Sequence, residues 1–138
     1  MANRYVGGDI TEITFNHPTL GNFNFATKSN ESYTLDPGGV RGDDDSDMVT
    51  GSGANIRKLN NKRWSFEGPL VADFASNLEI KNLPLISGDP EEGTITISHI
   101  GGAIWRGQGS FVGEISIDTN TSQFSAKFAG GGILELLN

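Results

Sequence analysis

Three alternating aspartates, Asp43, Asp45 and Asp47, have the spacing most suggestive of a metal site. They match positions 1, 3 and 5 of a calcium-binding loop, in which alternate carboxylates face one ion. The rest of that pattern fails, because position six is Met48 instead of glycine and position twelve is Ala54 instead of a bidentate glutamate. The spacing therefore favours a solvated or salt-bridged acidic loop, with calcium binding as the minor alternative.

Other catalytic and cofactor-binding patterns are missing from the sequence. His17 precedes a proline in a predicted turn and His99 ends a predicted strand, so both are expected to be structural. No nucleophile elbow, Walker-type loop or zincin helix occurs. Gly107, Gly109 and Gly113 miss the dinucleotide-binding spacing and lie in a predicted strand, at points of bend or close approach. We expect no catalytic residue, no metal and no cofactor.

Glu67 and Glu114 are the carboxylates considered for acid–base hydrolysis of a glycan. Nothing in the sequence places them across a cleft, so an enzyme is the least favoured hypothesis. Residues 41–43 spell an integrin-recognition tripeptide, and Asn30 and Asn120 begin glycosylation sequons. Since the N-terminus has no apolar run typical of a secretory signal, ordinary turn chemistry is the favoured explanation of these motifs.

The composition is typical of a folded, acidic protein. Nineteen glycines among 138 residues without a G-X-Y period exclude collagen, and 36% hydrophobic residues with eight phenylalanines exclude a disordered chain. Ten basic and seventeen acidic residues give a net charge of −7, which argues against a surface that binds nucleic-acid phosphates or anionic lipid. The absence of cysteine removes disulfide and thiol chemistry. No apolar stretch reaches the roughly 18 residues of a membrane span, so we expect a protein made in the cytoplasm without a membrane partner.

The elements that must position these residues are mainly strands, in one domain that spans residues 1–138. Residues 9–15 and 22–27 flank a turn and predict a hairpin. Residues 31–35 predict a third strand, which a Pro-Gly-Gly turn ends. The pattern indicates an antiparallel β-sandwich or barrel with one short helix and a long loop.

The second half of the chain predicts further strands and the helix. Residues 64–70 and 94–100 have the alternation of strands, and residues 71–81 have the period of a short amphipathic helix. Residues 103–117 predict a pair of strands or one long bent strand. With residues 122–128 they predict a long hairpin that has one apolar and one polar face. The core is expected to contain Trp64, Phe66, Phe74, Leu78, Phe111, Ile115, Phe124 and Phe128.

Residues 38–62 are too polar to be core and predict a long arm. Acidic residues in its first half are followed by basic residues in its second half, and such clusters can pair within a subunit or between subunits. The residues expected to make contacts between subunits or rings are Arg41, Asp43, Asp44, Asp45, Asp47, Arg57 and Lys58. A disordered surface loop is the alternative.

The order of these elements resembles that of the tail tube proteins of tailed bacteriophages and related injection machines. The resemblance depends on residues 107–115, followed by residues 124–131, and on the preceding strand at residues 63–67. It covers most of the chain as an order of elements, and its motifs are loose.

The resemblance implies a virion protein of the tail, made in the cytoplasm of a bacterial host. Hexameric rings would share a ring-shaped β-barrel and stack into a tube, through which DNA passes without specific binding. Sheath, terminator, baseplate and tape-measure proteins would be further partners. The polar face of the long hairpin and of residues 64–70 would line the lumen through Glu67, Glu114, Ser116, Gln123 and Ser125. Lys127 and Arg63 depart from the negative or neutral lumen that DNA passage requires, unless they are paired or turned toward an interface.

A β-sandwich that decorates a virion or binds carbohydrate is the alternative to a tube subunit. Such a module would use Trp64 or Trp105 as a stacking platform for a sugar. Exposure discriminates the two hypotheses, because a sugar platform leaves its tryptophan in solvent and a tube subunit buries it.

Overall fold

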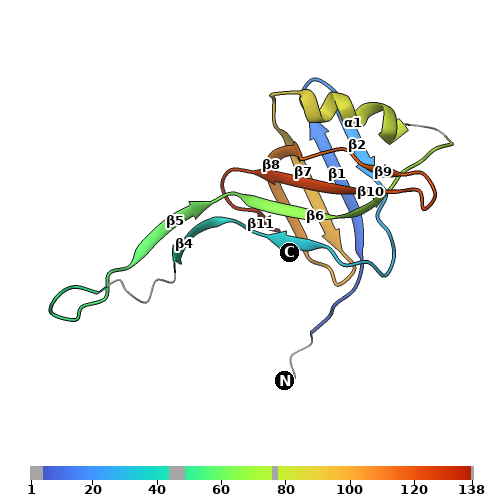
Figure 1. Ribbon diagram of the computed structural model, residues 1–138. Coiled ribbons are helices and arrows are strands. Elements are labelled where there is room, and N and C mark those ends of the chain that lie inside the picture. Colours follow the sequence, from blue (N-terminus) through green and yellow to red (C-terminus); the bar gives the residue numbers. More distant parts are fainter. Residues whose placement is uncertain (1–4, 44–48, 76–77, 138) are drawn as a thin grey trace.

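The computed structural model describes residues 5–43, 49–75 and 78–137, which form antiparallel strands and one helix (Figure 1). The predicted fold class, mainly β and antiparallel with one short helix, is confirmed for these residues.

A first sheet has the strand order β2-β1-β7-β8. β1 and β2 form the predicted N-terminal hairpin, with Phe15 opposite Phe23 and Ile13 opposite Phe25. β7 pairs with the other edge of β1 and then with β8. These strands are β1 (Ile10–His17), β2 (Gly21–Phe25), β7 (Gly93–His99) and β8 (Ile104–Val112).

β8 continues into a second sheet of order β8-β10-β6-β3. Its first part pairs with β7, and residues 110–112 pair with β10. An isolated bridge between Thr27, which follows β2, and Leu70 of β6 joins the two sheets on their other side. The sheets therefore curl into a partly closed barrel. The further strands are β3 (Thr34–Asp36), β6 (Trp64–Val71), β9 (Ile117–Asp118), β10 (Gln123–Gly130) and β11 (Glu135–Leu136), of which β9 pairs with β10 and β11 with β8.

The core between the two sheets is rich in aromatic rings. The ring centroid of Phe128 lies 6.1 Å from that of Phe15, 5.8 Å from that of Phe25 and 5.5 Å from that of Phe111. Tilted and edge-to-face pairs of this kind stabilise a core beyond the area that they bury. Five of the eight residues predicted for the core are confirmed as buried: Trp64, Phe66, Phe111, Phe124 and Phe128.

The expected core positions of Phe74 and Ile115 are wrong, since their exposed fractions are 42% and 37%. Phe74 lies in a turn between β6 and the helix. Ile115 lies in residues 113–116, where the chain leaves the sheet after Gly113 adopts a φ of 89°. Leu78 begins the helix, but its side chain lies outside the described residues.

The helix α1 (Leu78–Gly88) begins and ends later than the predicted helix at residues 71–81. Val71 is still part of β6, because it pairs with Gln123 of β10 and its N–H donates to the carbonyl oxygen of Ala26 at 3.0 Å. The helix lies across the end of the barrel at which β1 ends (Figure 1). Its buried residues Leu83 and Ile86 are three positions apart and therefore share one side of the helix.

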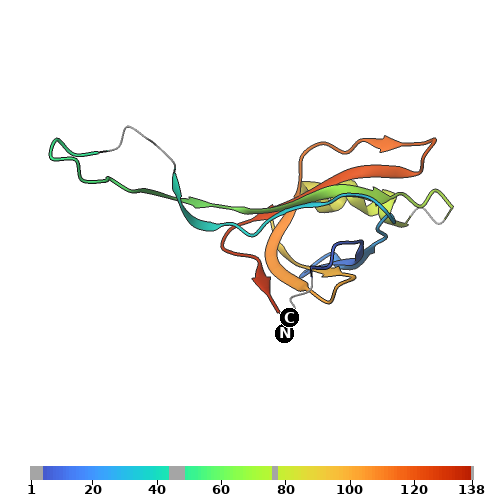
Figure 2. The same cartoon turned by 90° about the horizontal axis from the view of Figure 1, so that it is seen from below.

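The predicted arm at residues 38–62 contains a hairpin of β4 (Gly39–Asp43) and β5 (Lys58–Lys62). These strands form a separate two-stranded sheet that projects from the barrel (Figures 1 and 2). The arm expected from the sequence is therefore an extended hairpin. Near its tip, an isolated β-bridge pairs Val49 with Asn55.

Candidate assembly surfaces

One face of the arm carries two exposed apolar side chains, Val40 and Leu59, together with Asn61, and we call it the apolar face. Directly opposed residues of an antiparallel pair share a face, as do residues two apart along a strand. Val40 opposes Asn61 and Gly42 opposes Leu59, so Val40 and Leu59 lie on the same face. Their exposed fractions are 65% and 56%. A two-stranded sheet without a core is at best marginally stable in water, so this face is suited to a partner.

The root of the arm is fixed by an ion pair within the chain. Arg41 donates to both carboxylate oxygens of Asp36, at 2.6 and 3.3 Å, and the N–H of Gly38 donates to the same carboxylate at 3.0 Å. The hydrogen bonds from Arg41 and then from Gly38 lower the pKa of Asp36. Arg41, which was expected to contact another subunit, is therefore paired within its own chain.

The other residues expected to make contacts between subunits lie along the arm. Arg57 and Lys58 are exposed, and the guanidinium of Arg57 lies beside Gly42, where an added Cβ would be 3.2 Å from its Nε atom. Asp43 ends β4 opposite Lys58, but its side chain lies outside the described residues, as do Asp44, Asp45 and Asp47 entirely. The calcium hypothesis therefore concerns residues that the structure does not describe.

The residues expected from the sequence to line a channel lie on β6 and β10 and in the loop between β8 and β9. Glu67 and Ser125 are exposed on neighbouring strands, and Lys127 lies directly opposite Glu67. Opposite charges at such cross-strand positions attract one another, which accounts for a lysine on this face. Gln123 is half-buried, and its Oε1 atom accepts a hydrogen bond of 2.6 Å from Lys28.

Two further residues expected to line the channel, Glu114 and Ser116, are exposed but lie in the loop between β8 and β9, outside the strands. Of the two alternatives expected for residues 103–117, the structure has two strands and not one long bent strand, because the chain leaves the sheet between β8 and β9. Glu114 nevertheless lines the same shallow hollow of about 280 Å³ as Glu67 and Lys127. No aromatic side chain is among the described residues around that hollow, so nothing there would stack on a sugar ring.

A second polar face, on the outside of the first sheet, was missed from the sequence. The registers align Asn24, Thr14, Thr96, Arg106 and Glu135 in one row across β2, β1, β7, β8 and β11. The available signal was the polar residue at every second position of residues 12–16 and 94–98. Both sheets therefore present polar side chains to solvent on their outer faces.

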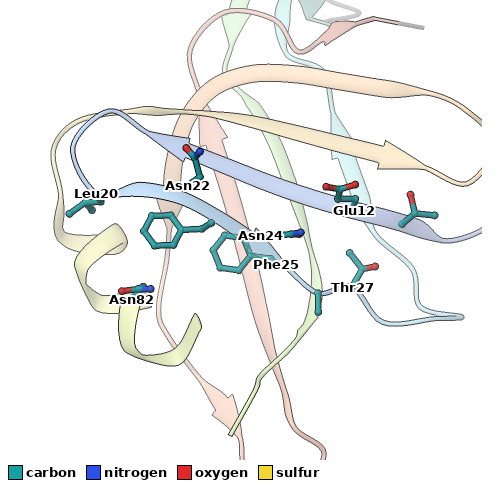
Figure 3. A pocket seen from close by; sticks show the side chains of 10 residues that line it. Glu12, Leu20, Asn22, Asn24, Phe25, Thr27 and Asn82 are labelled. Carbon is teal, nitrogen blue, oxygen red and sulfur yellow. The ribbon is translucent and has the colours of Figure 1, made fainter. Parts of the chain in front are cut away.

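A groove of about 1030 Å³ follows the unpaired edge of β2, beside the helix (Figure 3). Leu20 and Phe25 contribute apolar surface, and the amides of Asn22, Asn24 and Asn82 line the groove. Phe23 is half-buried within it. The groove was also missed from the sequence, since it depends on where the helix packs.

Both histidines make contacts that are structural. The Nδ1 atom of buried His17 accepts hydrogen bonds from the backbone N–H groups of Thr19 and Leu20, at 3.2 and 3.0 Å. Its Nε2 atom lies 3.3 Å from Oδ1 of Asp89, in a geometry too poor for a hydrogen bond. The Nδ1 atom of His99 accepts a hydrogen bond of 2.9 Å from the backbone of Gly101.

Neither tryptophan is an exposed platform for a sugar. Trp64 is fully buried, and its indole N–H donates to the carbonyl oxygen of Gln108 at 3.0 Å. Trp105 is half-buried and packs against the core. Full burial of Trp64 and half-burial of Trp105 disfavour carbohydrate binding by either residue.

Comparisons with known proteins do not assign a family. No protein-family model matches the chain, and no curated protein matches it significantly. In the part of the chain that the structure describes, no helix is long and apolar enough to cross a membrane.

Proposed function

We propose that this protein is a structural subunit that assembles with copies of itself into the tail tube of a virion. Hexameric rings would stack into the tube and conduct DNA, and tube ends would contact sheath, terminator, baseplate and tape-measure proteins. The observation that carries the proposal is the projecting arm of β4 and β5, whose apolar face is exposed in the single chain.

The arm is costly to an isolated subunit. It contributes no residue to the described core, yet Val40 and Leu59 remain in water. Ordering these strands loses conformational entropy, which burial of an apolar face against a neighbour would offset. Self-assembly therefore accounts for an element that the fold of one chain does not need.

Open sheet edges support the same proposal. In the part of the chain that the structure describes, no strand pairs with the edge of β2 that faces away from β1 over Gly21–Phe25, or with the edge of β3 that faces away from β6. Unpaired edges promote uncontrolled association unless they are covered. Contacts between identical subunits in a closed ring would cover them.

The polar outer faces fit a conduit for DNA. The proposed lumen face carries Glu67, Glu114, Ser116, Gln123 and Ser125, and Lys127 lies opposite Glu67. With a net charge of −7, the chain is not suited to hold phosphates. A lumen of this kind would allow DNA to slide without adhering.

Electron microscopy and analytical ultracentrifugation of the purified protein test the proposal. We expect rings or stacked tubes with a central hole. A species that stays monomeric over the whole accessible concentration range, with or without a preformed tube end as initiator, would contradict self-assembly.

A further inference from the structure

We infer that the unpaired edge of β2 is the receptor for the arm of a second copy, with β5 added beside β2 as an extra strand. This inference rests on the proposed self-assembly and names the two surfaces that meet. Strand addition of this kind uses main-chain hydrogen bonds for affinity and side-chain pockets for specificity.

The backbone of β2 is directed correctly for such an addition. The carbonyl oxygen of Ala26 accepts a hydrogen bond from the N–H of Val71, on the side away from β1. Backbone polar groups alternate in direction along a strand, so those of Asn24 and Asn22 point to the same side. In the described residues no strand pairs with Gly21–Phe25 on that side. These groups are available to a new strand.

β5 matches this edge in length and is the better donor of the two arm strands. Both β2 and β5 are five residues long. Among the described residues β4 is the strand that pairs with β5, and no strand pairs with the other edge of β5. β4 contains Gly39 and Gly42, which weaken a strand, whereas β5 has neither glycine nor proline.

The side chains of the two surfaces are complementary. Leu59 would bring the apolar face of the arm toward two half-buried residues of the groove, Leu20 (Figure 3) and Phe23. Among the described residues that line the groove, Glu12 is the one with a charge. β5 carries Lys58 and Lys62 and no acidic residue. The donor is therefore basic and the receptor acidic.

The arm and the groove lie toward opposite ends of β6. β5 leads into β6 at Trp64, whereas Leu70, near the other end of β6, bridges to Thr27, which follows β2 (Figure 1). An arm that projects away from the barrel cannot return to its own β2, so the occupant is a second copy. Two different surfaces then meet at each contact, and such head-to-tail contacts generate rings or filaments.

Complementation between two variants tests the contact. Asn24→Pro removes an outward N–H from the receptor without removing a bond to β1, and proline is tolerated at such edge positions. Val40→Glu with Leu59→Glu removes the apolar donor face, and both positions are exposed. We expect each variant alone to be monomeric. Mixed together, they retain one intact contact and should form a 1:1 heterodimer with twice the 14.7 kDa of one chain.

A charge exchange tests the same contact without changing the backbone. Glu12→Lys should raise the concentration needed for assembly by about tenfold or more, and adding Lys62→Glu in the same chain should restore it. Glu135→Lys, an equal charge reversal at an exposed position of β11, which pairs with β8, is the matched control and should assemble as the wild type does. Circular dichroism should show the same β content for every variant.

The outcomes separate this inference from the proposed function. If Asn24→Pro or the arm variant assembles as the wild type does, or the folded variants do not form the heterodimer, the contact between β5 and β2 is wrong and self-assembly stands. If the wild type does not assemble, both are wrong.

Discussion

The indole N–H of Trp64 donates to the main-chain carbonyl oxygen of Gln108, although β10 lies between the strands that carry these two residues. The ring spans β10 on the inner side of the sheet and lies against Gly107 and Gly109, which flank Gln108. An added Cβ would lie 3.2 Å from the indole at Gly107 and 2.6 Å from it at Gly109. The glycines in this strand thus make room for a buried tryptophan.

Gly109→Ala should therefore destabilise the barrel. The new Cβ would lie 2.3 Å from the carbonyl oxygen of Ala129 as well as 2.6 Å from the ring of Trp64, and neither group can move without disturbing the sheet. Overpacking of this kind costs about 1–3 kcal/mol of the free energy of unfolding. Urea denaturation followed by tryptophan fluorescence measures the loss.

Gly131→Ala is the matched control for this substitution. Nothing lies within 4 Å of an added Cβ there, and its φ is outside the left-handed region. The free energy of unfolding should change by less than about 0.5 kcal/mol. Equal effects at the two positions would contradict the steric explanation.

The sequence was sufficient to predict elements whose residue pattern lies within a short stretch of the chain. The alternation of residues 9–15 and 22–27 predicts the first hairpin, and the glycines of residues 107–113 predict close approach. It was not sufficient for Val71 and Ala72, because their helical period competes with pairing to residues 122–123, which only the folded sheet provides. Tertiary pairing overrides local propensity at such a boundary.

The candidate surfaces were only partly predictable for the same reason. The polarity of residues 38–62 indicates an arm, but Lys58–Lys62 does not alternate like a strand, so the hairpin was not expected. The groove at β2 combines residues from β1, β2 and the helix. Its formation depends on distant packing, for which a single sequence carries no direct signal.

Arg41→Ala should raise the pKa of the Asp36 carboxyl toward its ordinary value. In the wild type the lowered pKa of Asp36 means that the ion pair contributes to stability at pH values above the ordinary carboxyl pKa near 4. This contribution is lost as the pH falls through the lowered pKa. NMR titration of the side-chain carboxyl carbons measures both proteins. The pair is solvent-exposed, so we expect a shift in titration with little change in global stability.

Asp118 is the internal control for that titration. Its pKa is also lowered, but by hydrogen bonds from the backbone N–H groups of Thr121 and Asn120 in its own turn. Arg41→Ala should leave the Asp118 curve unchanged. A parallel shift of Asp118, or an unmoved Asp36, would show that the contact at 2.6 Å is not the cause.

His17→Ala should loosen the turn between β1 and β2. The substitution leaves two backbone N–H groups without their acceptor and opens a cavity beside the ring of Phe15, whose centroid is 6.0 Å from that of His17. The expected loss in the free energy of unfolding is about 2–4 kcal/mol. Urea denaturation measures it, and hydrogen exchange at Thr19 and Leu20 should accelerate first.

His99→Ala provides the comparison, since that side chain accepts one hydrogen bond in an exposed turn. Its loss should be below about 1 kcal/mol. A larger effect at His99 than at His17 would reverse the assignment of which histidine supports the fold.

Replacement of residues 40–61 by Asn-Gly should separate folding from assembly. Gly39 and Lys62 are directly paired at the root of the arm, so a two-residue turn can join them. The hydrogen bond from Leu134 to the carbonyl oxygen of Pro37 and the contact of Gly38 with Trp64 both lie outside the replaced segment. Because no described residue of the arm belongs to the core, the melting temperature should change by no more than about 4 °C.

The shortened chain should nevertheless fail to form tubes, since it lacks both β5 and the exposed face of Val40 and Leu59. Calorimetry gives the melting temperature, and electron microscopy shows whether rings or tubes form. An unfolded product would mean that the arm stabilises its own barrel, contrary to its position outside the core. Normal tubes would mean that the unpaired sheet edges alone hold the subunits together. Only a folded subunit that does not assemble agrees with an arm whose role lies between copies of the chain.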